Sequence, residues 1–146
     1  MKISFDLDDT IIPGIKTFET EPQTLIQKLL GAEKIRKGTI KLFKELKNRN
    51  HTVGIYTTSF RSRLKIKLTF LLNGFSVDFI VNQKIHLNEL ANRQIKPSKY
   101  PTLFGIDIHV DDSKGVEMEG EKYNFKTIII DEKQLDWTDQ ILERVS

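Results

Sequence analysis

The sequence has 146 residues, 38% of them hydrophobic, with a formal net charge of +3 and no cysteine. A chain of this length buries roughly two-thirds of its surface on folding, so we expect one domain that needs no disulfide or structural metal. The lack of cysteine excludes a disulfide scaffold, a thiolate zinc site and a cysteine nucleophile. The net charge is too small to indicate nucleic-acid binding by itself, although it slightly favours anionic substrates.

No apolar stretch approaches the roughly 18 residues that a membrane-spanning helix needs. Met1 to Ile3 lead straight into an apolar run, which is not typical of a signal peptide. We therefore expect a cytoplasmic protein without a membrane partner. The motifs GxxxxGK[ST] and GxGxxG are absent, which excludes nucleotide-binding loops of those two kinds.

Short β-rich apolar runs alternate along the chain with longer segments of helical periodicity. This alternation predicts an α/β, Rossmann-like three-layer fold with a central parallel sheet of about five strands. The expected strands are Lys2 to Asp6, Thr52 to Tyr56, Asp78 to Val81, Ile106 to Val110 and Lys126 to Ile130.

The helix pattern is clearest at Thr39 to Arg49 and at Arg61 to Asn73. The second of these helices should end at Gly74. Its expected buried stripe consists of Leu64, Leu68, Leu71 and Leu72. Further helices are expected at Pro22 to Leu30, Lys114 to Glu121 and Trp137 to Arg144. The polar segment Asn82 to Pro101 is expected to be mostly loop, with one short helix near Asn88.

Polar clusters follow three of the expected strands. These clusters are Asp6-Leu7-Asp8, Thr57-Thr58-Ser59 and Asp111-Asp112-Ser113. In an open parallel sheet, ligands bind beyond the carboxyl ends of the strands, where the strand order reverses. We therefore expect the three clusters to meet in one site.

Asp6 and Asp8 can approach one point only if the backbone leaves the strand directly after Asp6. Two carboxylates in a partly dry crevice repel each other unless a cation or a proton is shared between them. Oxygen ligands suit hard divalent ions, and Mg²⁺ is the expected metal.

Each cluster also has a purely structural interpretation. Asp8-Asp9-Thr10 can cap a turn, and the Thr57 and Asp111 clusters can cap the helices that follow them. The basic residues Arg61, Arg63, Lys65 and Lys67 either bind phosphate or nucleic acid or, as we favour, form a solvated helix face. We expect His109, within a buried strand, to have a structural or supporting role.

The segment Phe5-Asp6-Leu7-Asp8-Asp9-Thr10 resembles the first signature of the haloacid dehalogenase-like (HAD) superfamily, an apolar run followed by DxDxT. Val53 to Thr57 is similar to the second signature, and Ile108 to Asp112 is similar to the fourth in its paired-Asp form. The third signature is a lysine upstream of the fourth strand. Lys96 and Lys99 are both candidates, and we prefer Lys99 because it lies closer to that strand.

The resemblance implies a Mg²⁺-dependent phosphatase that hydrolyses a phosphomonoester through an aspartyl-phosphate. Asp6 would be the nucleophile and Asp8 the general acid, which the dehalogenase members lack. The resemblance assigns phosphate binding to Thr10, Thr57, Thr58 and Lys99, and Thr57 and Lys99 also count as catalytic. The metal would bind the Asp6 carboxylate, the Asp8 backbone carbonyl and Asp111, with Asp112 ligating directly or orienting a bound water.

Members of this superfamily differ in their cap domains, and neither gap between signatures is long enough here to hold one. We expect a single catalytic domain over residues 1–146, with a flap-like segment at about residues 11–22. An uncapped site suggests a phosphorylated substrate that is macromolecular, or a homo-oligomer that covers the opening. The alternatives are a catalytically weak phosphate-recognition or scaffold protein, and a phosphatase that acts on phosphoproteins or nucleic-acid ends.

Overall fold

The apolar runs form a five-stranded parallel sheet in the computed structural model, which describes residues 1–146. The strands are β1 (Lys2–Phe5), β2 (Thr52–Tyr56), β3 (Phe79–Val81), β4 (Ile108–Asp111) and β5 (Lys126–Ile129). The α-helices are α1 (Leu25–Leu29), α2 (Thr39–Asn48), α3 (Arg63–Leu72), α4 (Gln83–Leu90), α5 (Lys114–Tyr123) and α6 (Trp137–Arg144). A short 3₁₀ helix, η1 (Pro101–Phe104), precedes β4. None of these helices is both long and apolar enough to cross a membrane.

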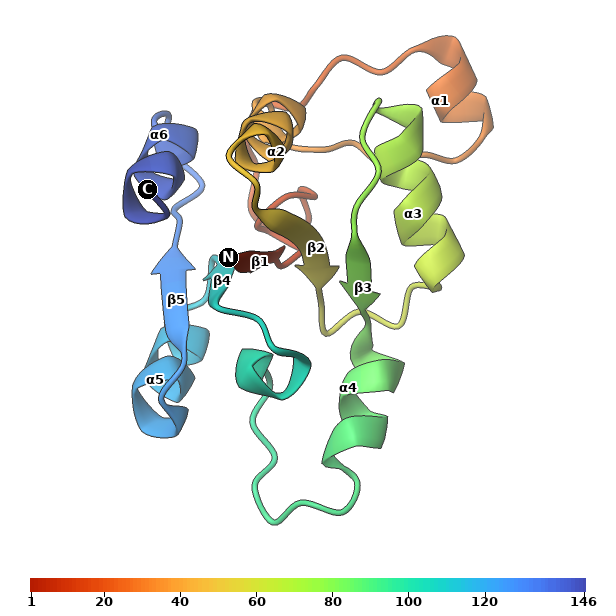
Figure 1. Ribbon diagram of the computed structural model, residues 1–146. Coiled ribbons are helices and arrows are strands. Elements are labelled where there is room, and N and C mark those ends of the chain that lie inside the picture. The colour runs from red at the N-terminus through yellow and green to blue at the C-terminus, as the bar shows by residue number, and fades with distance from the viewer.

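The strand order is β3-β2-β1-β4-β5, and every neighbouring pair is parallel. The chain winds outward from β1 through β2 to β3 and then crosses back to place β4 beside β1. In Figure 1, α2, α3 and α6 lie on one side of the sheet and α4 and α5 on the other. The expected three-layer α/β fold is confirmed, and its winding reverses between β1 and β4, where such folds bind ligands.

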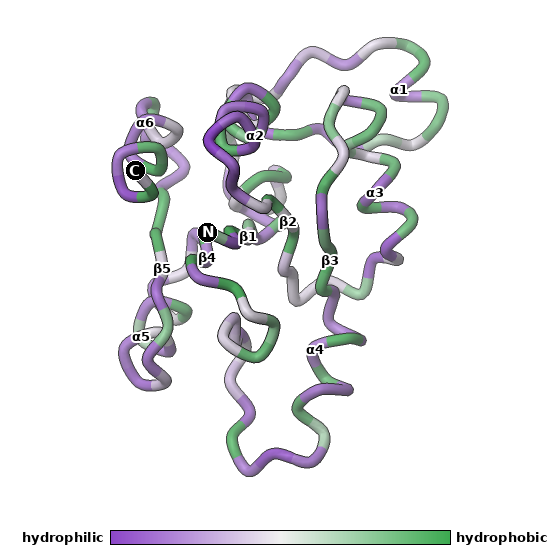
Figure 2. Tube along the Cα trace, in the orientation of Figure 1, coloured by the Kyte–Doolittle hydropathy of each residue, from purple (hydrophilic) through white to green (hydrophobic).

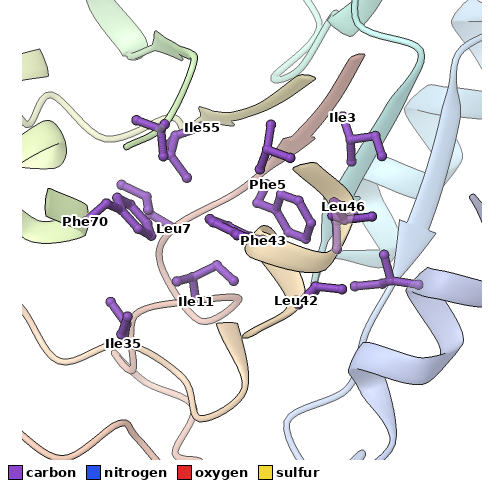
Figure 3. Packing of buried hydrophobic residues seen from close by; sticks show 14 of the residues in the cluster. Ile3, Phe5, Leu7, Ile11, Ile35, Leu42, Phe43, Leu46, Ile55 and Phe70 are labelled. Atoms are coloured by element: carbon purple, nitrogen blue, oxygen red, sulfur yellow. The ribbon is translucent and has the colours of Figure 1, made fainter. Parts of the chain in front are cut away.

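The main hydrophobic core lies between the sheet and the helices that follow β1 and β2. It contains 23 buried hydrophobic residues, and Phe43 of α2 lies near its centre (Figure 3). The ring centroid of Phe43 is 4.6 Å from that of Phe5, 5.7 Å from Phe70 and 5.2 Å from Phe75. Aromatic rings at such separations add to the stabilisation from area burial alone.

The segment from Asn82 to Pro101 is mostly loop with one short helix, as expected, and the helix that contains Asn88 is α4. The Asn82 side chain accepts a hydrogen bond from the Ile85 N–H at 3.1 Å and so caps the first turn. His86 and Leu90, four residues apart, are the buried residues of this helix. The two prolines that suggested a loop lie beyond its end.

The expected buried stripe of α3, however, is wrong. Ile66, Thr69 and Phe70 are the buried residues of this helix, whereas Leu64, Leu68 and Leu71 are 66%, 43% and 44% exposed. The helix starts at Arg63 rather than Arg61, because the Ser62 hydroxyl caps it. Figure 2 shows hydrophobic residues along α1 and α3 as well as in the strands. Part of the apolar surface of this protein therefore faces outward.

Replacing Phe43 with alanine should lower the free energy of unfolding by about 3–5 kcal/mol, because a cavity would replace a buried ring with three aromatic neighbours. Phe60→Ala is the matched control, since Phe60 is 72% exposed and its loss should change stability by less than about 0.5 kcal/mol. Urea unfolding followed by circular dichroism measures both. Equal effects of the two substitutions would contradict this description of the core.

Candidate active site

The backbone turns sharply where β1 ends. Asp6, the first residue after the strand, is 7% exposed. The Leu7 carbonyl accepts hydrogen bonds from the N–H groups of Ile11 at 2.9 Å and Ile12 at 2.7 Å. Asp9 has a φ of 62°, in the left-handed region that tight turns require. The chain thus leaves the strand at Asp6, as the spacing of the acidic residues predicted.

A buried lysine lies against the Asp6 carboxylate. Lys99 is 2% exposed, and its Nζ donates hydrogen bonds to Asp6 Oδ1 at 2.6 Å and to the Tyr56 carbonyl at 2.8 Å. The same Nζ is 3.5 Å from Asp111 Oδ2. Lys96, the other candidate, is exposed. The structure brings the preferred lysine to the ends of β1, β2 and β4.

A chain of hydrogen bonds holds the loop that carries Lys99. The Tyr100 N–H donates to the Tyr56 hydroxyl at 2.8 Å, and that hydroxyl lies 2.6 Å from His86 Nδ1. His86 Nε2 lies 3.0 Å from the Pro97 carbonyl, so it is the donor and Nδ1 the acceptor. Burial lowers the pKa of His86, which keeps the ring in the neutral form that this series of hydrogen bonds requires. Sequence reasoning missed this support, because Tyr56 lies 30 residues from His86 and 44 from Tyr100 in the sequence.

Three carboxylates gather at the switch point between β1 and β4. Asp6, Asp111 and Asp112 each offer an oxygen within 4.8 Å of the others. The Thr10 hydroxyl donates to Asp112 Oδ1 at 3.0 Å, and Lys16 Nζ lies 2.7 Å from Asp112 Oδ2. The sequence did not single out Lys16, which reaches the site from the loop after β1.

The start of the flap-like segment is tied to the turn after β1. Asp9 Oδ1 accepts hydrogen bonds from the N–H groups of Gly14 at 3.1 Å and Lys16 at 2.8 Å. Residues 13–19 contain no helix or strand. These two bonds fix the direction in which Lys16 leaves the backbone toward Asp112.

Burial and neighbouring charges shift the pKa values of Asp6 and Asp111 in opposite directions. Burial raises the pKa of Asp6, although the Lys99 charge opposes this, and the Asp111 charge adds to the increase. Burial would also raise the pKa of Asp111, but the hydrogen bond from His109 and the Lys99 charge lower it. Three carboxylates meet only two lysines here, Lys99 and Lys16, and this excess of negative charge favours binding of a further cation.

His109 holds Asp111 from within the sheet. Its side chain is fully buried, with Nδ1 2.7 Å from the Ser4 hydroxyl and Nε2 3.0 Å from Asp111 Oδ2. The carboxylate can only accept, so Nε2 carries the proton and Nδ1 accepts from Ser4. Burial and the Lys99 charge lower the pKa of His109 to about 4, so the ring is neutral at pH 7.

The Asp8 carboxylate is not part of the cluster of three carboxylates and binds an arginine instead. Arg61 Nη1 donates a hydrogen bond to Asp8 Oδ2 at 2.9 Å, and Nη2 lies 2.9 Å from Asp8 Oδ1. Arg61 Nε lies 2.8 Å from Glu33 Oε2. The hydrogen bond to Asp8 is the main cause that raises the pKa of Arg61. The favoured interpretation of Arg61 as part of a solvated helix face is wrong, because this residue precedes α3 and binds two carboxylates.

The predicted phosphate-binding hydroxyls lie in different environments. Thr57 is buried directly after β2, and its Oγ1 accepts a hydrogen bond from the Ser59 N–H at 3.1 Å. Thr58 is exposed and makes no side-chain hydrogen bond. Thr10 is fully buried, and its hydroxyl is directed to Asp112 rather than to solvent.

The chain is similar in structure to a predicted HAD-like family hydrolase from Porphyromonas gingivalis. The TM-score is 0.53 at 12% sequence identity, over 99% of this chain and 97% of that one. This likeness shows the fold. No protein-family model matches the sequence, and no curated protein matches it.

The buried His109 makes stability depend on pH. Its pKa is about 4 in the folded protein and 6.5 in an unperturbed histidine. Between these values the unfolded chain binds a proton that the folded protein excludes, so the free energy of unfolding should fall as pH falls through this window, by up to about 3 kcal/mol. The raised pKa of Asp6 has the opposite effect, because the folded protein binds that proton more tightly and the free energy of unfolding rises as the pH falls.

Comparison with His109→Gln separates the two effects, because Asp6 is present in both proteins. Urea unfolding at several pH values between 7.5 and 4.5 should show that the wild-type protein loses stability relative to the variant as the pH falls. Parallel curves for the two proteins would contradict a neutral, buried His109.

Proposed function

We propose that the protein is a Mg²⁺-dependent hydrolase of the HAD type that cleaves a phosphomonoester through an aspartyl-phosphate. One observation carries the proposal: a buried lysine lies 2.6 Å from one oxygen of an aspartate at the end of β1, beside two further aspartates. This group of side chains meets the main needs of phosphoryl transfer, which are a nucleophile, a site for a metal and fixed positive charge.

Asp6 is the proposed nucleophile. Its Oδ1 accepts the hydrogen bond from Lys99, whereas its Oδ2 accepts none and is available to attack phosphorus. Attack forms the bond between Asp6 and phosphorus and breaks the bond from phosphorus to the leaving oxygen. Lys99 offsets the negative charge of the phosphoryl oxygens as the two groups approach.

Asp8 is the proposed general acid and base. It protonates the leaving alcohol in the first step and takes a proton from water in the second, in which water attacks phosphorus and releases Asp6 and inorganic phosphate. The Asp8 side chain is 47% exposed and bound to Arg61, so the substrate has to compete with Arg61 for this carboxylate. Arg61 would then control when Asp8 can turn toward the phosphoryl group.

The acidic cluster fits a divalent ion with oxygen ligands. Asp6, Asp111 and Asp112 would hold Mg²⁺, which would neutralise phosphoryl charge and orient the substrate. Hydrogen bonds from Ser113 to Asp111 and from Thr10 to Asp112 fix the two carboxylates at the end of β4. The Asp8 backbone carbonyl would be a further ligand of the metal.

The proposed substrate class includes phosphorylated macromolecules. The connection from β1 to α2 contains only α1 and loops. The stretch from β2 to β4 contains α3, the sheet strand β3, α4 and η1, so neither stretch holds a separate cap. The site mouth would then be bordered by the flap-like segment at about residues 11–22, which would contribute to specificity. In a homo-oligomer, a neighbouring subunit would cover the mouth of the site instead.

Asp6→Asn tests the proposal most simply, because it keeps the size of the side chain and removes the nucleophile. Hydrolysis of an aryl phosphate in the presence of Mg²⁺ should fall by more than about 1,000-fold, since the groups of such a site act as a unit. Asp107→Asn is the matched control: Asp107 is exposed, lies before β4 and should leave turnover unchanged. Mutant turnover equal to the wild type, or turnover without Mg²⁺, would contradict the mechanism.

Thr10→Val tests how the metal ligands are held. The substitution removes the hydrogen bond to Asp112 at nearly constant volume, so Mg²⁺ affinity measured by calorimetry should fall by about 10- to 100-fold. Thr102→Val replaces an exposed threonine in η1 and should have no effect. An unchanged Mg²⁺ affinity in Thr10→Val would show that Asp112 is not oriented by this residue when the metal binds.

A further inference from the structure

Large exposed hydrophobic side chains are concentrated on α1 and α3 and on the residues next to these helices. Of the thirteen that are exposed in the whole protein, eight lie here, between 43% and 77% exposed. We call this surface the leucine face, and it consists of Leu25, Ile26, Leu29, Leu30, Phe60, Leu64, Leu68 and Leu71. Isolated exposed leucines are common in proteins, but a contiguous group marks an interaction site.

The two helices lie side by side, so the leucine face is one surface (Figure 1). Gln27, the buried residue of α1, donates a hydrogen bond at 2.7 Å to the Leu72 carbonyl at the end of α3. Leu30, Leu64 and Leu68 line a common hollow of about 350 Å³. The short helix α1 therefore buries its glutamine and exposes its three aliphatic residues, and Leu30 directly after it is exposed as well.

Positive charge borders the leucine face. At 3.6 residues per turn, Leu64, Leu68 and Leu71 form one stripe along α3, and Lys65 and Lys67 project on opposite sides of it. The other exposed basic side chains of residues 24–34 and 60–73 are Lys28, Lys34 and Arg63, and none of these five cations is in an ion pair. The acidic residue of these two segments, Glu33, is paired with Arg61.

We propose that the leucine face binds the surface of a lipid bilayer that contains anionic lipids. This proposal departs from the expectation of no membrane partner, which rested on the lack of a membrane-spanning helix. Leucine, isoleucine and phenylalanine bordered by lysine and arginine are typical of helices that lie in the membrane interface. Anionic headgroups complement the five unpaired cations, and the apolar side chains enter the boundary of the acyl chains.

The composition of the leucine face does not suit a partner protein or a second copy of the chain. Protein interfaces are enriched in aromatic residues, methionine and arginine and depleted of lysine, whereas the face has one aromatic residue, no methionine, and a border of four lysines and one arginine. A second copy of the chain, docked face to face, would bring two rings of like charge together. The inference does not depend on the proposed phosphatase activity.

Sedimentation of the full chain with lipid vesicles tests the proposal. The protein should sediment with vesicles of equal parts phosphatidylglycerol and phosphatidylcholine at low salt, bind phosphatidylcholine alone much more weakly, and be released at about 0.5 M salt. The double variant Leu64→Ser/Leu68→Ser should bind about tenfold or more weakly. Lys65→Glu/Lys67→Glu should lose the preference for the anionic vesicles.

Leu135→Ser is the matched control, because Leu135 is 93% exposed but lies before α6, outside the leucine face. It should bind the vesicles as the wild-type protein does. Circular dichroism and thermal unfolding establish that each variant is folded. Absence of wild-type binding, or undiminished binding by a folded Leu64→Ser/Leu68→Ser variant, would overturn the proposal. A dimer in sedimentation velocity that this double variant dissociates, without vesicle binding, would instead assign the face to a second copy.

Discussion

A buried lysine among carboxylates is the interaction on which the rest of this structure depends. Lys99 Nζ lies 2.6 Å from Asp6 Oδ1 and 3.5 Å from Asp111 Oδ2, with all three residues almost entirely buried. A buried charge without its partner costs several kcal/mol, so neither the lysine nor the aspartates could remain here alone. The ends of β1 and β4 and the loop after α4 are therefore stable in their positions only together.

The sheet and its surroundings hold these charges in place from several directions. Parallel pairing of β1 with β4 sets Asp6 beside Asp111, and His109 fixes Asp111 from inside the sheet. On the other side, the hydrogen bonds from Tyr56 through His86 hold the loop that carries Lys99. Residues that touch no substrate thus position those that would, which is how a site on a rigid scaffold gains precision.

The sequence predicted the parts of the fold that depend on local patterns. Alternating apolar runs and helical periodicity gave the five parallel strands, and the carboxylates placed at strand ends gave the site around Asp6. Sequence-based prediction failed where tertiary contacts determine which residues are buried and which residues pair. In α3, four leucines formed the more obvious stripe, but packing against the main core buries Ile66 and Phe70 instead. The partners of Arg61 lie 28 and 53 residues away, and no local pattern could reveal them.

The central claim is that Asp6 attacks phosphorus beside a metal held by the neighbouring aspartates. A crystal structure of the protein with Mg²⁺ and beryllium fluoride, which mimics a phosphoryl group bonded to a carboxylate, tests it most directly. The account predicts beryllium bonded to Asp6 Oδ2, with Lys99 contacting the fluoride atoms and Mg²⁺ held by Asp6 and Asp111. Beryllium fluoride bound elsewhere, or an Asp6 that contacts Lys99 alone, would contradict the account.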